Sequence, residues 1–263
     1  MVESLEARVR AWMADDVEAE DRAELEGLLE RLKEDPGGST LKELASRFSG
    51  PLRFGTAGLR GRVEAGPARM NRATVIRATA GLAAVLLEDA NAATRGVVLG
   101  RDARRGSEAF QADAAAVLEA QGIQVWWLPG TVPTPVVAFA VRRLRAAAGI
   151  MITASHNPPR DNGYKVFWGP EGAQIVSPLD ARIASAIDAQ PGARHVPRPS
   201  APGPRRQQRS DLIEAYLEMA CGLRFVSDAP VEALPLVYTA MHGVGGPLFL
   251  RALERRGFRQ VTP

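Results

Sequence analysis

Apolar and polar positions follow a helical pattern at the start of the chain. Residues 3–33 carry apolar side chains every three or four positions, in two amphipathic segments with acidic flanks. A Pro-Gly-Gly turn at 36–38 ends this pattern, and Ser39 or Thr40 is placed to cap a further short helix. The pattern therefore predicts an N-terminal helical segment over residues 1–48.

Strand-like and helix-like segments alternate in the next part of the chain. Helices are predicted over 71–90, 107–121, 134–145 and 178–189, and strands over 96–100, 123–128, 148–153 and 166–168. Strands separated by helices of this length are typical of layered α/β folds. The fold class we predict is α/β, with one layered domain over 49–190.

A Pro-rich, basic stretch follows this domain at 191–209. Its cations are Arg194, His195, Arg198, Arg205, Arg206 and Arg209. We interpret the stretch as a solvated linker, with a site for an anionic partner as the alternative. Aromatic residues do not interleave with these cations, which argues against a surface for single-stranded nucleic acid.

The last part of the chain, 210–263, repeats the strand–helix order. It contains a helix at 210–220, a strand at 234–239, a Gly-rich turn, a helix at 247–256 and the start of another strand. We interpret it as the start of a second α/β domain that the chain does not complete, and expect the chain to be a fragment.

Composition and charge narrow the class of protein. The net charge of +3 is too small to indicate a nucleic-acid partner, and no apolar run approaches the roughly 20 residues that span a bilayer. The N-terminus lacks the apolar core of a signal peptide. A single cysteine, Cys221, excludes an internal disulfide and fits a reducing cytoplasm. We expect a cytoplasmic protein of undetermined oligomeric state.

The segment from 146 to 165 carries the candidate chemistry. An apolar run at 146–152 ends in Thr-Ala-Ser-His-Asn-Pro-Pro, as a buried strand that enters a loop would. Ligands of open α/β sheets gather at the carboxyl ends of strands, so Ser155 stands where a reactive hydroxyl is useful. Lys165 follows closely and is one of only three lysines among the 33 basic residues. A lysine, unlike arginine, can lose its proton when its surroundings lower its pKa.

A serine-hydrolase interpretation fits this segment poorly. The sequence has no Gly-x-Ser-x-Gly elbow around Ser155. His156 is adjacent in sequence, and neighbouring side chains on extended backbone diverge, so we expect His156 not to act as a triad base for Ser155.

Several motifs together resemble one known family. They are Gly149 to Pro158, Asp161 to Lys165, Phe54 to Gly61, Gly100 to Arg104, Pro133 to Pro135, Gly172 to Pro178 and Met241 to Gly245. These motifs resemble those of the α-D-phosphohexomutases, the family of phosphoglucomutase and phosphomannomutase. The sequence Phe-Gly-Thr-Ala-Gly-Leu-Arg is most similar to that of the branch that contains phosphoglucomutase-2 and phosphopentomutase.

This resemblance implies an isomerase that acts by intramolecular phosphate transfer. Phosphate would move between C1 and C6, or C5, of a hexose or pentose phosphate through phosphorylated Ser155 and a bisphosphate intermediate. The resemblance places His156 and Lys165 near the phosphoserine as candidates for proton transfer. For His156, orienting a phosphate and acting as the general base are both open.

Further site residues fall into two groups. The Gly-rich segment with Thr56 and Arg60, together with Asn157, is expected to bind substrate oxygens, although such a segment alone would be interpreted as an ordinary loop. A second set is expected to support the Ser loop: Arg101, Asp102, Arg104, Asp161 and Asn162. For the Arg-Asp-Ala-Arg group, a structural ion pair and a site role are both open.

The resemblance also implies Mg²⁺, bound through the phosphate on Ser155 and an Asp-x-Asp-x-Asp-Arg loop. This sequence contains no Asp-x-Asp. Glucose 1,6-bisphosphate or a similar compound is the implied activator. We expect little mutase activity from this chain alone, and the alternative is a non-catalytic phosphosugar-binding or regulatory protein. Which sugar phosphate is used cannot be determined from these residues.

Overall fold

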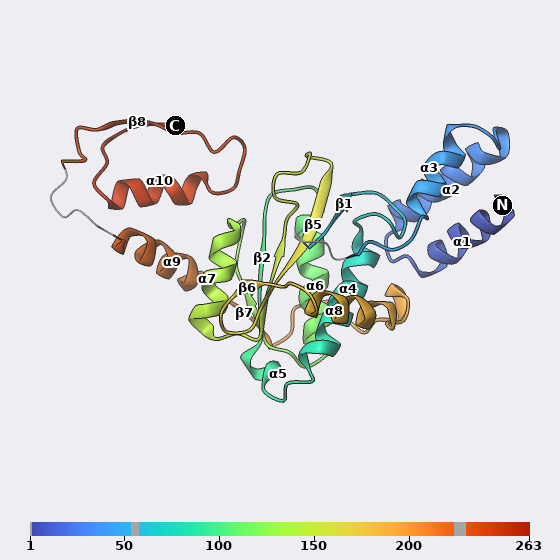
Figure 1. The fold of residues 1–263 in the computed structure, drawn as a ribbon, viewed down its shortest axis with the longest axis horizontal. Helices are drawn as coiled ribbons and strands as arrows, with labels where there is room; N and C mark the ends of the chain where they lie inside the picture. Colours follow the sequence, from blue (N-terminus) through green and yellow to red (C-terminus); the bar gives the residue numbers. More distant parts are fainter. Residues whose placement is uncertain (1, 54–57, 224–229) are drawn as a thin grey trace.

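The computed structural model describes residues 2–53, 58–223 and 230–263. A central sheet with helices on both faces forms the body of the molecule (Figure 1). Three N-terminal helices project at one end of this body, and a small C-terminal unit lies at the other end. The predicted α/β class is confirmed.

The sheet follows the order β1-β5-β4-β2-β3-β7. Its parallel centre consists of β4 (Ala148–Ile152), β2 (Val97–Arg101) and β3 (Val125–Trp127). These strands are rich in β-branched and apolar residues, as expected for strands covered on both faces. The three strands agree with the predicted ones to within a few residues at each end.

The sequence pattern did not predict most of the antiparallel side of the sheet. Strand β5 (Asp161–Trp168) pairs with β4 and with β1 (Leu59–Arg62), and β6 (Ala173–Gln174) pairs with β5. The prediction gave β5 only its last three residues and placed β1 in a Gly-rich loop. Asp, Asn and Gly are poor strand formers in isolation, and here pairing with two neighbours overrides that preference.

Helices cover the two faces of the sheet. One face carries α4 (Arg72–Leu86), α6 (Ser107–Ala120) and α8 (Leu179–Asp188), while the other carries α7 (Thr134–Leu144) and α9 (Asp211–Gly222). The predicted helix over 71–90 is shorter, because Asn71 caps α4 by accepting a bond from Thr74 N and α4 ends at Leu86. A separate turn of helix, α5 (Ala92–Arg95), follows.

The N-terminal helices α1 (Val2–Asp15), α2 (Ala19–Glu34) and α3 (Ser39–Arg47) match the predicted helical segment. Their leucines form a core of their own, in which Leu25, Leu28 and Leu44 are fully buried. The predicted cap of the third helix is wrong, because Ser39 lies within α3 and Gly38 precedes it without a side-chain cap.

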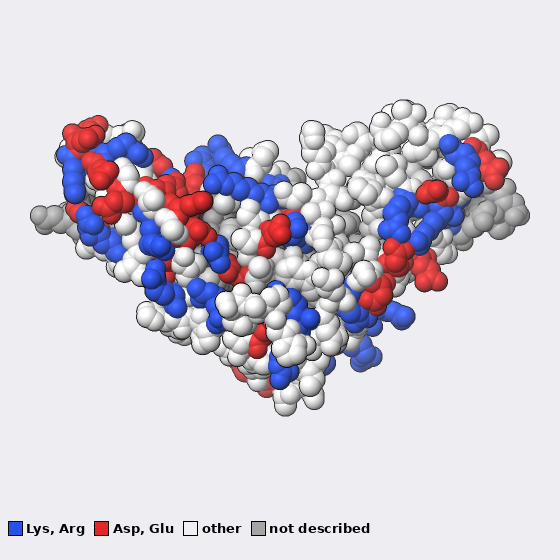
Figure 2. Space-filling view, turned by 180° about the vertical axis from the view of Figure 1, so that it is seen from behind, with Lys and Arg blue, Asp and Glu red and all other residues white. Residues whose placement is uncertain are grey.

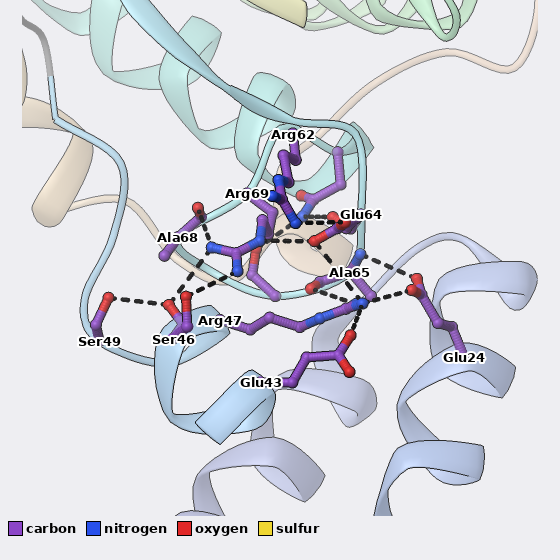
Figure 3. A network of polar contacts seen from close by, with 12 residues as sticks. Glu24, Glu43, Ser46, Arg47, Ser49, Arg62, Glu64, Ala65, Ala68 and Arg69 are labelled. Atoms are coloured by element: carbon purple, nitrogen blue, oxygen red, sulfur yellow. Dashed lines mark hydrogen bonds and ion pairs between the residues drawn. The ribbon is translucent and has the colours of Figure 1, made fainter. Parts of the chain in front are cut away.

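A buried arginine ties these helices to the sheet domain (Figure 3). Arg47 is ion-paired with Glu24 and Glu43 at 2.8 and 2.6 Å and donates to Ala65 O. Glu64, just beyond β1, lies 3.7 Å from the same guanidinium. A buried cation requires such partners. The helices therefore pack on the domain that carries the candidate site.

The segment 191–209 differs from the solvated linker we expected. Ala193 and Val196 are buried against α4 and α6, and β7 (Arg206–Gln208) extends the sheet by pairing with β3. The Arg206 guanidinium lies 5.3 Å from the ring centre of Trp127. The basic stretch binds here because the edge of β3 would otherwise be unpaired and the ring of Trp127 attracts the Arg206 cation. The division of the chain into domains stays a prediction.

The C-terminal unit contains β8 (Pro235–Val237), α10 (Gly246–Arg255) and β9 (Gln260–Thr262), close to the predicted elements. Strands β8 and β9 form a two-stranded parallel sheet. Acidic and basic side chains are interspersed over the face in Figure 2 rather than gathered by sign. None of the helices in the described part of the chain combines the length and apolarity needed to cross a bilayer.

Candidate active site

Ser155 projects from the turn that follows β4. Its backbone N–H donates to the hydroxyl of buried Thr153 at 2.9 Å. Its φ of +62° is in the left-handed region, which costs a non-glycine residue roughly 1 kcal/mol or more. This turn leaves Ser155 exposed at the carboxyl end of a fully buried strand.

One arginine holds the whole turn. The Arg104 guanidinium donates to four backbone carbonyls at 2.8–3.0 Å, those of Ser155, Asn157, Pro158 and Asp161. Its Nε lies 3.3 Å from Asp102 Oδ2. A planar guanidinium with five donors suits such convergent acceptors. The Ser155 turn is thus fixed by backbone contacts that do not depend on its own side chains.

Buried polar groups support Arg104 from below. Asp102 Oδ1 accepts bonds from Arg104 N at 3.0 Å and from Ser107 Oγ at 2.8 Å. Asn162, fully buried, donates to Ser107 Oγ and to Arg105 O, both at 2.9 Å. The contacts of Asp102, Arg104 and Asn162 thus support the Ser155 turn. Arg101 contacts Asp102 O and, at 3.4 Å, the exposed Glu108, so it borders this network.

Lys165 enters the site from β5. It lies opposite Met151 of β4 and shares a strand face with Phe167, the face on which α7 packs. The side chain is 9% exposed. Burial lowers the pKa of its ammonium group, and the positive charge of Arg60 lowers it further. Lys165 therefore can give up its proton more readily than a surface lysine.

Arg60 and Asn157 complete the arrangement. Arg60 lies on β1 opposite Gly163, and its Nη1 donates to Asn157 Oδ1 at 3.3 Å. Asn157 Nδ2 donates to Asp161 Oδ2 at 2.9 Å. A Cβ on Gly163 of β5 would lie 2.6 Å from the carbonyl oxygens of Leu59 and Thr153. Only glycine at this position therefore lets β1 and the residue after β4 pack so closely against β5.

The Arg60 Nε atom is buried and has no hydrogen-bond partner within the described residues. Leaving such a donor unpaired costs roughly 1–3 kcal/mol. The positive charges of Arg60 and Lys165, next to the Ser155 turn, give this site a preference for an anionic oxygen ligand.

The geometry of His156 corrects one expectation. Its Nδ1 lies 3.4 Å from Ser155 Oγ, a long contact, although we expected the two side chains to diverge. That expectation assumed extended backbone, whereas Ser155 adopts the left-handed conformation. Both roles of His156, donating a hydrogen bond that orients a phosphate and acting as the general base, therefore stay geometrically open.

Thr56, predicted to bind substrate, lies outside the described residues. Sequence reasoning missed Thr153 and Ser107, which hold the turn and its support. The sequence did carry a signal for both residues. Each is a small hydroxyl residue, one directly after a buried strand and the other at the first turn of a helix.

The site does not by itself form a magnesium centre. Ser155 contributes one hydroxyl oxygen, and no group of three His, Cys, Asp or Glu side chains gathers as metal ligands within residues 2–53, 58–223 and 230–263. Mg²⁺ requires near-octahedral oxygen coordination. The described residues therefore do not fit the ion, and we derive no step through it.

Comparisons with known proteins show which proteins this chain resembles. Phosphoribomutase of Saccharomyces cerevisiae is 38% identical over 238 residues, which cover 82% of this chain and 37% of the relative. Human glucose 1,6-bisphosphate synthase is 34% identical over 271 residues, which cover 98% of this chain and 42% of the relative. The chain thus spans about two fifths of the length of these relatives.

A solved structure and a family model extend the comparison. The crystal structure of a phosphoglucomutase/phosphomannomutase family protein from Burkholderia thailandensis superposes with a TM-score of 0.62 and 26% identity, over 80% of this chain and 43% of that one. The model of the phosphoglucomutase/phosphomannomutase α/β/α domain I matches residues 51–193. The chain therefore belongs to the phosphoglucomutase/phosphomannomutase family.

Proposed function

We propose that this chain provides the phosphoryl-carrying domain of a phosphosugar mutase, with Ser155 as the carrier. The observation that carries the proposal is that Arg60 links the other groups: its guanidinium donates to Asn157 of the exposed Ser155 turn, and its charge lowers the pKa of the buried Lys165. The relatives named phosphoribomutase and glucose 1,6-bisphosphate synthase support a hexose or pentose phosphate as substrate.

In the first half-reaction, Ser155 Oγ attacks a phosphate of a sugar bisphosphate. The bond between phosphorus and the sugar oxygen breaks, a bond from phosphorus to Oγ forms, and the serine proton passes to the departing sugar oxygen. Lys165 or His156 would carry this proton. In the reverse direction, phosphorylated Ser155 donates to a free sugar hydroxyl, whose proton is taken up by the same group. Such transfer depends mainly on positioning and charge stabilisation.

The remaining residues would position the reactants. Arg60 and Asn157 would bind oxygens of the sugar phosphate, since a forked guanidinium suits phosphate. Arg104, Asp102 and Asn162 would keep the Ser155 turn in its attacking conformation. We expect little complete turnover from the chain alone, because no carboxylate cluster in its described part neutralises phosphoserine through a metal.

The proposal is tested by ³¹P NMR of the chain incubated with glucose 1,6-bisphosphate. The expected result is a protein-bound phosphoserine signal, with glucose monophosphate released in equal amount. The variant Ser155→Ala should give neither, while Ser200→Ala, which changes an exposed serine of the segment after α8, should behave as the unchanged chain. Tight binding of the bisphosphate without transfer would instead support a non-catalytic phosphosugar-binding protein.

A further inference from the structure

A second concave site lies on the helical face of the sheet domain, between α4, α6 and the segment 194–206. Its volume is about 830 Å³, within the range of pockets that hold small molecules. Among its lining residues are Arg72, Asp113, Arg194, His195, Arg198 and Arg206. We call it the linker pocket. None of the residues assigned to the candidate active site lines it.

Two of the four arginines in the linker pocket are neutralised. Arg72 is ion-paired with Asp113 at 2.7 Å and with Glu18 at 2.8 Å. Arg206 is ion-paired with Glu119 at 2.6 Å. These pairs fix the floor of the pocket, where two guanidinium groups face three carboxylates and the net charge is −1.

The other two arginines have no carboxylate partner among the described residues. Arg194 donates to Asp16 O at 2.7 Å, and Arg198 donates to the carbonyls of Ala193 and Val196 at 2.8 and 3.0 Å. Neutral carbonyls orient a guanidinium without cancelling its charge. Each of these side chains also retains N–H groups without a bond in the described structure. The pocket therefore presents two cations with free donors, and its four arginines and three paired carboxylates sum to a charge of +1.

The wall that carries these cations is fixed in place. The Asp15 carboxylate accepts bonds from Ala193 N at 2.6 Å and Arg194 N at 3.2 Å. Ala193 and Val196 are buried with Ile76 and Val117 of the two helices. Because the arginines are oriented before any ligand arrives, binding does not have to order a flexible segment.

We propose that the linker pocket binds a small anion that carries phosphate groups. Phosphate oxygens suit forked guanidinium donors, and the exposed His195 side chain, with no bond of its own in the described structure, lies beside them. Among the described residues, no Phe, Tyr or Trp side chain lines the pocket, so nucleobases would find no large stacking surface. Pro197, Pro199 and Pro202 form part of its wall. This site is separate from Ser155 and does not depend on its chemistry.

The test is titration calorimetry of the full chain with inorganic pyrophosphate at low ionic strength. It is done in the Arg60→Ala background, so that the candidate active site contributes less to the heat. The expected result is saturable binding to one site, weakened by added salt. Arg198→Ala should weaken it about tenfold or more. Arg205→Ala, a neighbouring exposed arginine outside the pocket, should leave it unchanged.

A second variant keeps the proposal testable if Arg198→Ala fails to fold. His195→Glu removes no bond in the described structure and adds a negative charge beside the arginines, so it should also weaken binding about tenfold. The proposal is overturned if pyrophosphate binds more weakly than about 1 mM. Equal losses in Arg198→Ala and Arg205→Ala would overturn it too, because they would indicate diffuse attraction to a basic stretch.

Discussion

Residues 97–168 and residues 230–263 both have strand–helix–strand order, yet only the first stretch buries its apolar side chains. Val98, Ile150 and Val166 are fully buried between helices, whereas Val237 is 88% and Met241 82% exposed. Hydrophobic periodicity reports which face of an element could be buried. It does not report whether a partner surface covers that face. The Ser155 turn and Lys165 lie in the first stretch, whose apolar side chains are covered by helices.

Core truncation should separate the two stretches most strongly. Ile150→Ala, in the middle of β4, is expected to lower the free energy of unfolding by about 3–4 kcal/mol, because a packed core closes only partly around the lost atoms. Val237→Ala should change it by less than about 0.5 kcal/mol. Denaturant unfolding of both variants measures this, and similar losses would show that the exposed stretch is packed after all.

Replacement of one arginine in each stretch should also have unequal effects. Arg104→Ala removes four bonds to the Ser155 turn and should lower stability by about 1–3 kcal/mol. We also expect phosphoserine formation to slow at least about tenfold, since the turn loses its attacking conformation.

The matched control is Arg251→Ala in α10, whose guanidinium pairs with exposed Glu214. An exposed ion pair contributes roughly 0–1 kcal/mol, so stability and phosphorylation should hardly change. If Arg104→Ala were as mild, the turn would be stable without its clamp.

Replacement of Lys165 should affect chemistry and stability in opposite directions. Lys165→Met is expected to slow phosphoserine formation about 100-fold or more, because the proton carrier is lost. It should not lower stability at neutral pH. The pKa of Lys165 is below its unfolded value of 10.5, so the unfolded chain binds more protons and the charged lysine opposes folding.

That penalty is fully present below the lowered pKa and vanishes as pH rises to 10.5. The gain from Lys165→Met should therefore shrink in alkaline solution, as pH-dependent unfolding would show. Lys33→Met, on an exposed position of α2, should change neither rate nor stability. A loss of stability in Lys165→Met at neutral pH would mean that the ammonium group is satisfied by partners we have not identified.

A small effect is expected for the exposed aromatic pair of the C-terminal unit. Phe249→Ser in α10 replaces a side chain that is 44% exposed and packs on Tyr238 at 4.5 Å between ring centres. The loss should be no more than about 1 kcal/mol, measured by thermal unfolding. A larger loss would assign the C-terminal unit a core of its own.

How far the sequence predicts this molecule depends on where the information lies. The helices and parallel strands follow from local periodicity, and so does the position of Ser155 after a buried strand. Lys165 was singled out by the scarcity of lysines and by the family resemblance, and its role stays a prediction. Strand β1 and most of β5 could not be predicted, because Asp161, Asn162 and Gly163 form a strand only through pairing with partners distant in sequence. The same holds for the contact between His156 and Ser155, which depends on one left-handed residue.

The central claim, that Ser155 is the phosphoryl carrier, is tested most directly by phosphopeptide mapping after incubation with glucose 1,6-bisphosphate. The account predicts one phosphate per chain on the peptide that contains Ser155, and none on that peptide in Ser155→Ala. Phosphate on another serine, or a chain that stays unmodified while it binds the bisphosphate, would contradict it.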